Sequence, residues 1–202
     1  MARYTGPKTR LSRRFNEDLN LKTNSLKTLR RLNVAPGQHG LKNRRKPSQY
    51  SIQLREKQKL KALYGILEKQ LLRLYKEASV SEVATGAQML TFLEMRLDNV
   101  IYRLGWTKTR ATARQLVNHG HFVVNGKKAT IPSMRVKVGD VIMVKSRNSK
   151  VAILDELIKE PAVAAPEWLE VKGGAAKVAK FPERSQINEK IDEQLIVEFY
   201  SR

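Results

Sequence analysis

Residues 109–126 read Thr-Arg-Ala-Thr-Ala-Arg-Gln-Leu-Val-Asn-His-Gly-His-Phe-Val-Val-Asn-Gly, and this stretch combines a helical and a β pattern. Thr109 is a suitable N-cap and Gly120 a suitable helix stop, so the spacing predicts a helix between them. The period then changes to two, and Asn125-Gly126 is the strongest short signal for a β-hairpin. We therefore expect a helix that leads directly into a hairpin.

The flanking sequence extends this unit into a small module that contains both helices and strands. Upstream, residues 88–104 predict a helix, because leucine, valine and isoleucine recur on one stripe at helical spacing. Downstream, turn residues separate a strand at 141–144, a helix at 151–159, and strands at 168–171 and 177–181. The expected module is two helices packed on an antiparallel sheet, which makes the fold class α+β.

The first half of the chain predicts helices rather than strands. Ser48 is a suitable N-cap for a helix that Gly65 ends, and a second helix follows over residues 66–78. Residues 1–47 show little apolar periodicity, and a short helix around 26–32 is the one element expected there. We expect this first segment to order fully only on its partner.

These patterns divide the 202 residues into four parts. A basic N-terminal arm covers 1–47, a helical scaffold covers 48–88, and the module covers 89–185. The last part, 186–202, is acidic and apolar, and its residues 195–200 would be an aggregation hazard if left exposed. We expect it to dock back on the helical scaffold, and contact with another protein is the alternative.

Charge is distributed very unevenly along the chain. The net charge is +20, from 39 basic and 19 acidic side chains. Residues 1–50 carry 13 basic and 2 acidic side chains, and residues 101–150 carry 11 and 1. Residues 51–100 carry 8 and 6, and residues 151–202 carry 7 and 10. Two basic regions predict two contact surfaces on one large polyanion, since ordinary soluble surfaces intersperse both signs.

The composition excludes several classes of protein. The chain has no cysteine and three histidines, so it forms no disulfide and no thiolate site, and we expect no metal and no other cofactor. No apolar run approaches the length of a membrane span, and the N-terminus lacks the apolar core of a signal peptide. We expect a soluble, intracellular protein with no membrane partner.

Arginine recurs at helical spacing within the module. On ideal helices one polar face consists of Arg96, Asn99 and Arg103, and the next consists of Arg110, Arg114 and Asn118. Arginine offers a fork of donors that matches phosphate, and its plane stacks on unpaired bases. The two faces therefore predict a surface for the phosphates of a nucleic acid.

Two other interpretations fit part of this pattern. The first is that both faces are ordinary solvent-exposed helix surfaces with no partner. Such surfaces would carry more acidic residues, and one acidic residue among residues 101–150 is too few for ordinary ion pairing. A DNA-reading helix-turn-helix accounts for two helices and a short turn, but the sheet and the basic arm fit it less well. An aromatic content of 6% argues against a platform for single strands. Structured RNA is the favoured partner.

The sequence resembles a known family along nearly its whole length. In the module the matching residues are Arg96-Leu97-Asp98, Arg103, Thr109-Arg110, Ala113-Arg114-Gln115, His119-Gly120-His121, Val124-Asn125-Gly126 and Val138-Gly139-Asp140. Elsewhere they are Ala2-Arg3-Tyr4, Gly6-Pro7, residues 36–40, residues 53–59, Trp168-Leu169, Pro182-Glu183-Arg184 and residues 193–201. In these segments the chain is similar to the bacterial and plastid members of the small-subunit ribosomal protein four family. The RNA-binding module of that family also occurs in several RNA-modifying enzymes.

The resemblance implies a structural constituent of the ribosome. Such a protein would bind small-subunit ribosomal RNA directly, nucleate assembly of the subunit body and influence translational accuracy. It would contact ribosomal protein five, other small-subunit proteins, and messenger RNA where it enters the subunit. Its location would be the cytoplasm, or the plastid stroma for a plastid-encoded member, and no small-molecule substrate is implied.

The basic patterns and the resemblance together give three groups of candidate RNA-binding residues. In the arm they are Arg3, Lys8, Arg10, Arg13, Arg14, His39, Arg44, Arg45 and Lys46. In the scaffold they are Arg55 and Lys59. In the module they are Arg96, Arg103, Lys108, Arg110, Arg114, Gln115, His119, His121, Asn125 and Lys127.

No catalytic site is expected. Some members of the family carry an N-terminal cysteine cluster for a metal, but this chain has Thr9 and Ser12 there, so the metal is not carried over. Arg96-Leu97-Asp98 is also similar to the catalytic Arg-Leu-Asp of RNA pseudouridine synthases, yet it lies within a predicted helix and lacks their catalytic loop. His39 has neither a nucleophile nor a carboxylate clustered with it in the sequence.

Overall fold

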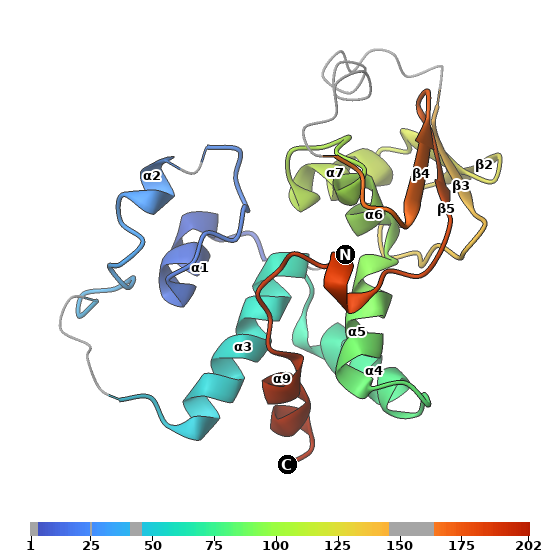
Figure 1. The fold of residues 1–202 in the computed structure, drawn as a ribbon. Coiled ribbons are helices and arrows are strands. Elements are labelled where there is room, and N and C mark those ends of the chain that lie inside the picture. Colours follow the sequence, from blue (N-terminus) through green and yellow to red (C-terminus); the bar gives the residue numbers. More distant parts are fainter. Residues whose placement is uncertain (1–3, 25, 41–45, 146–163) are drawn as a thin grey trace. The chain divides into compact units, whose positions relative to one another are not determined.

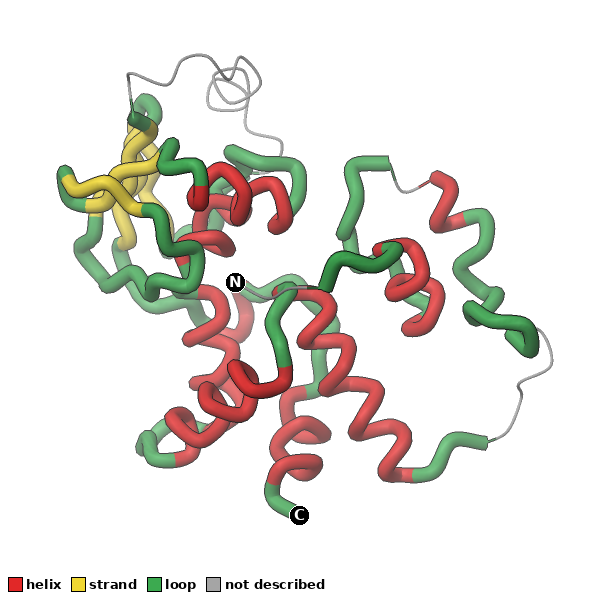
Figure 2. The backbone as a smooth tube through the Cα atoms, turned by 180° about the vertical axis from the view of Figure 1, so that it is seen from behind, coloured by secondary structure: helices red, strands yellow, loops and turns green. Residues whose placement is uncertain are grey.

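The computed structural model describes residues 4–24, 26–40, 46–145 and 164–202 (Figure 1). The chain forms two compact units, and each has its own packing. One comprises Met1–Met89 together with Glu189–Arg202, and the other comprises Leu90–Asn188. Figure 2 shows that the first unit is helical and that the strands gather in the second.

The first unit is built from helices α1 (Lys8–Phe15), α2 (Leu26–Leu29), α3 (Gln49–Tyr64), α4 (Glu68–Ser79) and α9 (Glu193–Tyr200). Helix α3 begins and ends as the sequence predicts. The Ser48 hydroxyl accepts a hydrogen bond from the Ser51 amide, and Gly65 ends the helix with a φ of 62°. Helix α1 was not predicted, because Leu11 and Phe15 are its only apolar residues, and of these only Phe15 is buried.

Helix α9 packs against α3, although more than a hundred residues separate them in the sequence (Figure 1). Ile196 is fully buried, and the ring of Phe199 lies 5.6 Å from that of Tyr50. The Gln53 side chain donates a 2.8 Å hydrogen bond to Glu198. The C-terminal segment therefore docks back on the chain, as the α+β prediction describes.

Glu68 at the start of α4 is the ionic centre of this helical unit. It accepts hydrogen bonds from Lys57 and Lys61 of α3, each at 2.9 Å, and from the Tyr200 hydroxyl of α9 at 2.7 Å. Burial by itself raises the pKa of Glu68, but these donors outweigh it and lower the pKa to about 2. Burial, with the neighbouring Glu68, also raises the pKa of Tyr200. One carboxylate thus connects three helices.

The second unit is a five-stranded antiparallel sheet with helices packed on it, which confirms the predicted α+β fold. Its strands are β1 (Phe122–Val124), β2 (Lys127–Ala129), β3 (Val141–Val144), β4 (Leu169–Lys172) and β5 (Ala175–Val178), in the spatial order β2-β1-β3-β5-β4. The helices are α6 (Leu97–Arg103) and α7 (Arg110–Asn118), and α5 (Thr85–Glu94) precedes them. The core includes Trp106, Phe122, Ile142 and Trp168.

The predicted helix over 88–104 is two helices, which corrects the sequence-based expectation. Helix α5 ends at Glu94 and α6 begins at Leu97, and Arg96 between them is extended, with a ψ of 137°. The Leu97 amide donates to the Met134 carbonyl at 2.8 Å, and residue 96 forms an antiparallel bridge with Arg135. A backbone partner forty residues away therefore interrupts a continuous apolar stripe.

The two hairpins differ in how well the sequence located them. Asn125 and Gly126 have φ values of 49° and 76°, as the predicted two-residue turn requires. The turn at Gly173-Gly174 is also present, but β4 and β5 occupy 169–172 and 175–178 rather than 168–171 and 177–181. The predicted helix at 151–159 lies outside the described residues. Within the described ranges, no helix is long and apolar enough to cross a membrane.

Candidate nucleic-acid interface

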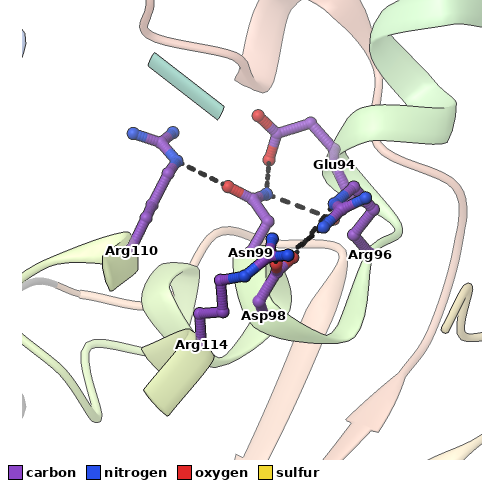
Figure 3. A network of polar contacts seen from close by, with 6 residues as sticks. All are labelled: Glu94, Arg96, Asp98, Asn99, Arg110 and Arg114. Atoms are coloured by element: carbon purple, nitrogen blue, oxygen red, sulfur yellow. Dashed lines mark hydrogen bonds and ion pairs between the residues drawn. The ribbon is translucent and has the colours of Figure 1, made fainter. Parts of the chain in front are cut away.

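Asp98 and two arginines form a buried ionic triad at the start of α6 (Figure 3). Arg96 donates to both carboxylate oxygens of Asp98, Nε at 3.1 Å and Nη2 at 2.7 Å. Arg114 of α7 donates from Nη1 to the same carboxylate at 3.3 Å. All three residues are at most 7% exposed. Asp98 therefore fixes α7 against α6.

A second network joins Glu94, Asn99, Arg103 and Arg110. The Glu94 carboxylate accepts from Arg103 at 2.7 and 2.8 Å and from the Asn99 amide at 2.7 Å. The Asn99 side-chain oxygen accepts a 2.7 Å hydrogen bond from Nε of Arg110 (Figure 3). The Arg110 guanidinium also lies 4.3 Å from the centre of the Tyr102 ring. Arg110 is thus oriented by an amide and an aromatic ring, and it is only half-buried.

The predicted polar face of Arg96, Asn99 and Arg103 does not exist as a solvent-exposed surface. Arg96 precedes α6, so the helical spacing that would align the three is lost. Asn99 is 2% exposed, and Arg103 forms an ion pair with Glu94. Arg114 is buried in the same way. These arginines hold the scaffold beneath the surface, and their assignment as direct RNA contacts stays a prediction.

Several exposed polar side chains of this unit lie beside α7, on it, or on the first hairpin. Lys108 precedes the helix, Gln115 and His119 lie on it or at its end, and Lys127 and Lys128 begin β2. All five are exposed. They lie in the same unit as Arg110, and together these groups offer charged and neutral donors of the kind that phosphate oxygens accept.

Asp140 is the one acidic residue between 101 and 150, and its carboxylate is used within a turn. It accepts from the Asn125 side chain at 2.8 Å and from the Lys137 amide at 2.7 Å. The Asn125 side-chain oxygen in turn accepts from the Val141 amide at 2.9 Å. The Asn125 side chain therefore braces the hairpin. The Asp140 carboxylate is occupied by hydrogen bonds from Asn125 and from the Lys137 amide.

His119 and His121 stack with their ring centres 6.1 Å apart at the end of α7. Burial, together with the neighbouring His119, lowers the pKa of His121. Its Nδ1 is buried and has no hydrogen-bond partner among the described atoms. Relative to an exposed histidine, the neutral form of His121 is therefore favoured.

The candidates of the first unit have mixed surroundings. Arg10, Arg14, His39 and Lys46 are exposed, and Lys8 is half-buried. Arg3, Arg44 and Arg45 lie outside the described residues. Arg55 donates to the Phe15 carbonyl, which connects α3 to α1. Lys59 is 6% exposed and contacts Glu17 at 2.7 Å and the Lys190 carbonyl, so its charge is paired within the protein, and its assignment to RNA stays a prediction.

Sequence reasoning missed the contributions of Glu94 and Tyr102. Glu94 is 1% exposed, and the signal in the sequence is an acidic residue among Leu90, Leu93 and Leu97 of the apolar stripe, which indicates a buried acid with a cationic partner. Tyr102 has no such signal, because its contact with Arg110 is made between two separate helices. Among the described residues, no group of three histidine, aspartate or glutamate side chains could hold a metal ion.

Comparison with known proteins gives consistent matches over the whole chain. The model of the ribosomal protein S4/S9 N-terminal domain matches residues 3–94, and that of the S4 domain matches residues 95–142. The small ribosomal subunit protein uS4 of Herpetosiphon aurantiacus is 50% identical over 211 residues, with both chains fully covered. Those of Trichlorobacter lovleyi and Chlorobium limicola are 49% and 47% identical, again with full coverage of both chains.

Proposed function

The chain belongs to the ribosomal protein S4 family, and from this premise we propose that it binds small-subunit ribosomal RNA directly and early in assembly. A structural role in the small ribosomal subunit follows from the family, whose members are not enzymes. The observation that supports direct RNA binding is the contrast between buried and exposed cations in the second unit. Arg96 and Arg114 are buried and both form ion pairs with Asp98, whereas Lys108 and Lys127 are exposed.

This arrangement suits RNA read by shape and phosphate position. The buried triad fixes α7 on α6, so the exposed donors of α7 and the hairpin keep constant spacing. A preorganised cationic surface loses little conformational entropy when it meets a rigid phosphate array. The corresponding RNA contacts are those of Lys108, Arg110, Gln115, His119 and Lys127, with Arg10, Arg14, His39 and Lys46 of the first unit as a second surface.

Charge reversal tests the first of these surfaces. The double variant K108E/K127E changes two exposed residues, so the fold should persist while affinity for small-subunit ribosomal RNA falls at least tenfold in a filter-binding titration. The matched control is K69E/K76E, which makes the same charge change on exposed residues of α4. Equal loss of affinity in both variants would show that net charge alone, and not this surface, accounts for binding.

The partner and the place in assembly need separate measurements. Small-subunit ribosomal RNA should displace the protein from duplex DNA far better than the reverse, whereas a helix-turn-helix protein would prefer the duplex. A protein that nucleates the subunit body should bind ribosomal RNA with no other protein present. If binding instead required ribosomal protein five or another small-subunit protein, the chain would be a late addition and the proposal would fail.

Three further roles follow from the family and extend the proposal. We infer contact with ribosomal protein five, contact with messenger RNA where it enters the subunit, and an influence on translational accuracy. Crosslinking within assembled subunits tests the two contacts. A misreading reporter in cells that carry K108E/K127E tests the third, and an unchanged error rate with normal subunit levels would argue against it.

A further inference from the structure

Asn125 is the one asparagine in the sequence that a glycine follows. Both residues lie in the turn between β1 and β2, and both are exposed. A Cβ built on Gly126 would meet no described atom within 4 Å, so the space beside the turn is open. Glycine also has no side chain that hinders a close approach to its own backbone nitrogen. The Asn125-Gly126 pair is therefore accessible to water and sterically open.

This pair of residues can react with itself. When the backbone nitrogen of Gly126 attacks Cγ of Asn125, a succinimide ring closes in a step that needs no second molecule. The N–Cγ bond forms, the Cγ–Nδ2 bond breaks, and the Gly126 amide proton leaves with the side-chain nitrogen as ammonia. Water then adds to one of the two ring carbonyls and opens the ring. The products are aspartate or isoaspartate at position 125, and nothing is oxidised or reduced.

The fold restrains the atoms that this reaction must move. Nδ2 of Asn125 donates to Asp140 at 2.8 Å, and Oδ1 of Asn125 accepts from the Val141 amide at 2.9 Å. The Asn125 backbone amide also donates to the Val141 carbonyl at 2.9 Å. Asp140 is itself held by the Lys137 amide at 2.7 Å. Rotation of Cγ toward the Gly126 nitrogen must break both side-chain bonds, and one of these has a charged acceptor.

We propose that Asn125 is a deamidation site, and that its contacts with Asp140 and Val141 hold the reaction back in the folded protein. The modification is independent of RNA binding, since it requires no partner. Its products disrupt the turn. An aspartate places a second carboxylate against Asp140, where an amide donor had been. An isoaspartate lengthens the backbone of a two-residue turn that sets the pairing of Val124 with Lys127.

Incubation of the full chain, folded in buffer and unfolded in guanidinium chloride at the same pH, measures the restraint. Peptide mass spectrometry follows the exchange of the side-chain NH2 for OH, and a protein isoaspartate methyltransferase detects the isoaspartate. Asn125 should react about tenfold faster in the unfolded chain, because two hydrogen bonds are lost. Equal rates in the two conditions would show that the fold does not restrain the reaction.

An internal reference in the same sample tests the site itself. Asn24 is followed by serine, whose side chain hinders the attacking nitrogen. In the unfolded chain, Asn125 should react about tenfold faster than Asn24, since glycine removes that hindrance. If the two asparagines react at the same rate, Asn125 is no special site and the proposal fails.

Variants at position 140 locate the restraint. D140A removes the acceptor, so Asn125 should react about tenfold faster than in the folded wild type. The matched control, E170A, removes one carboxylate from an exposed position of β4 and should leave the rate unchanged. Circular dichroism establishes whether each variant is folded, and a folded D140A that reacts at the wild-type rate would contradict the proposal.

D140N serves as a second variant that preserves the shape of the side chain. An asparagine at 140 has one acceptor oxygen for two donors, Asn125 and the Lys137 amide, so the reaction rate should lie between those of wild type and D140A. If D140A does not fold, this comparison decides, and a folded D140N that reacts at the wild-type rate would overturn the role of Asp140.

The substitution N125D reproduces one product and tests its effect on the hairpin. The equilibrium constant for unfolding should rise about tenfold, because a hydrogen bond is replaced by a contact between like charges. Urea denaturation followed by tryptophan fluorescence reports on this unit through Trp106 and Trp168. The control N24D makes the same charge change at an exposed position and should alter the constant by less than about twofold. Equal stability of N125D and wild type would refute the disruption of the turn.

Discussion

The Asp98 carboxylate accepts a hydrogen bond from Arg114, sixteen residues further along the chain, while Arg96 occupies both of its oxygens. One acid thus compensates two guanidinium groups at a place where each residue is at most 7% exposed. The triad therefore fixes α7 on α6.

Replacing Asp98 with asparagine should strongly destabilise the second unit. The variant leaves the buried Arg96 and Arg114 without their carboxylate, which typically costs about 3–5 kcal/mol. Urea denaturation followed by tryptophan fluorescence measures this, because Trp106 and Trp168 lie in that unit. E170Q, at an exposed position of β4, is the control and should change stability by less than about 0.5 kcal/mol. A small effect of D98N would mean that the triad is dispensable.

Replacing Asn99 with leucine should weaken RNA binding through orientation rather than charge. The substitution removes the amide that connects Glu94 to Arg110, and the loss of its hydrogen bonds should cost about 1–3 kcal/mol in stability. Affinity for ribosomal RNA should fall while the salt slope stays unchanged, since no charge is lost. K108Q is the comparison, because it should lower the slope by about one. A reduced slope in N99L would contradict a positioning role.

The first unit should lose stability in acid because of Glu68. Its pKa is about 2 in the folded protein against 4.5 as the ordinary value, so its contribution is complete above pH 4.5 and declines as pH falls toward 2. The side chain is 44% exposed, and we expect a contribution of only about 1 kcal/mol after screening. Between pH 7 and 3, E68Q should lose correspondingly less stability than wild type, whereas E82Q should behave as wild type.

Substitution of Gly126 should test the turn without touching any packing. A Cβ at this position would meet nothing within 4 Å, but the φ of 76° is unfavourable for other residues. We expect G126A to cost about 1–2 kcal/mol from backbone conformation alone. K127A, at the next position, should cost less than about 0.5 kcal/mol in stability but should weaken RNA binding. Thermal denaturation and filter binding of both variants separate the two effects, and equal stabilities would refute the first.

The elements that were correctly predicted share a local physical cause. Ser48 and Thr109 accept hydrogen bonds from the amides three residues later, as an N-cap must, and both helices begin there. Gly65 and the Asn125-Gly126 pair adopt positive φ where the pattern required it. The cause lies within four residues in each case, so the amino-acid sequence by itself is sufficient to locate these elements.

The errors share a non-local cause. Residues 88–104 have a continuous apolar stripe, and the break at Arg96 is caused by the bridge to Arg135 and by the bond from Leu97 to Met134. Helix α1 has little apolar content of its own, and its ordered neighbours α2 and α3 come from elsewhere in the chain. A pattern in a short window contains no information about such partners.

For the candidate site, the sequence by itself determined that the excess of basic side chains falls in residues 1–50 and 101–150. These two regions together contain only three acidic residues. It could not determine which of those cations would face solvent. Arg96 and Arg114 are buried because Asp98 compensates them, and Lys59 is buried because Glu17 does, whereas Lys108 remains exposed. Charge is a property of each residue, but burial depends on carboxylates that only folding brings within a few ångströms, and so the tertiary structure alone decided it.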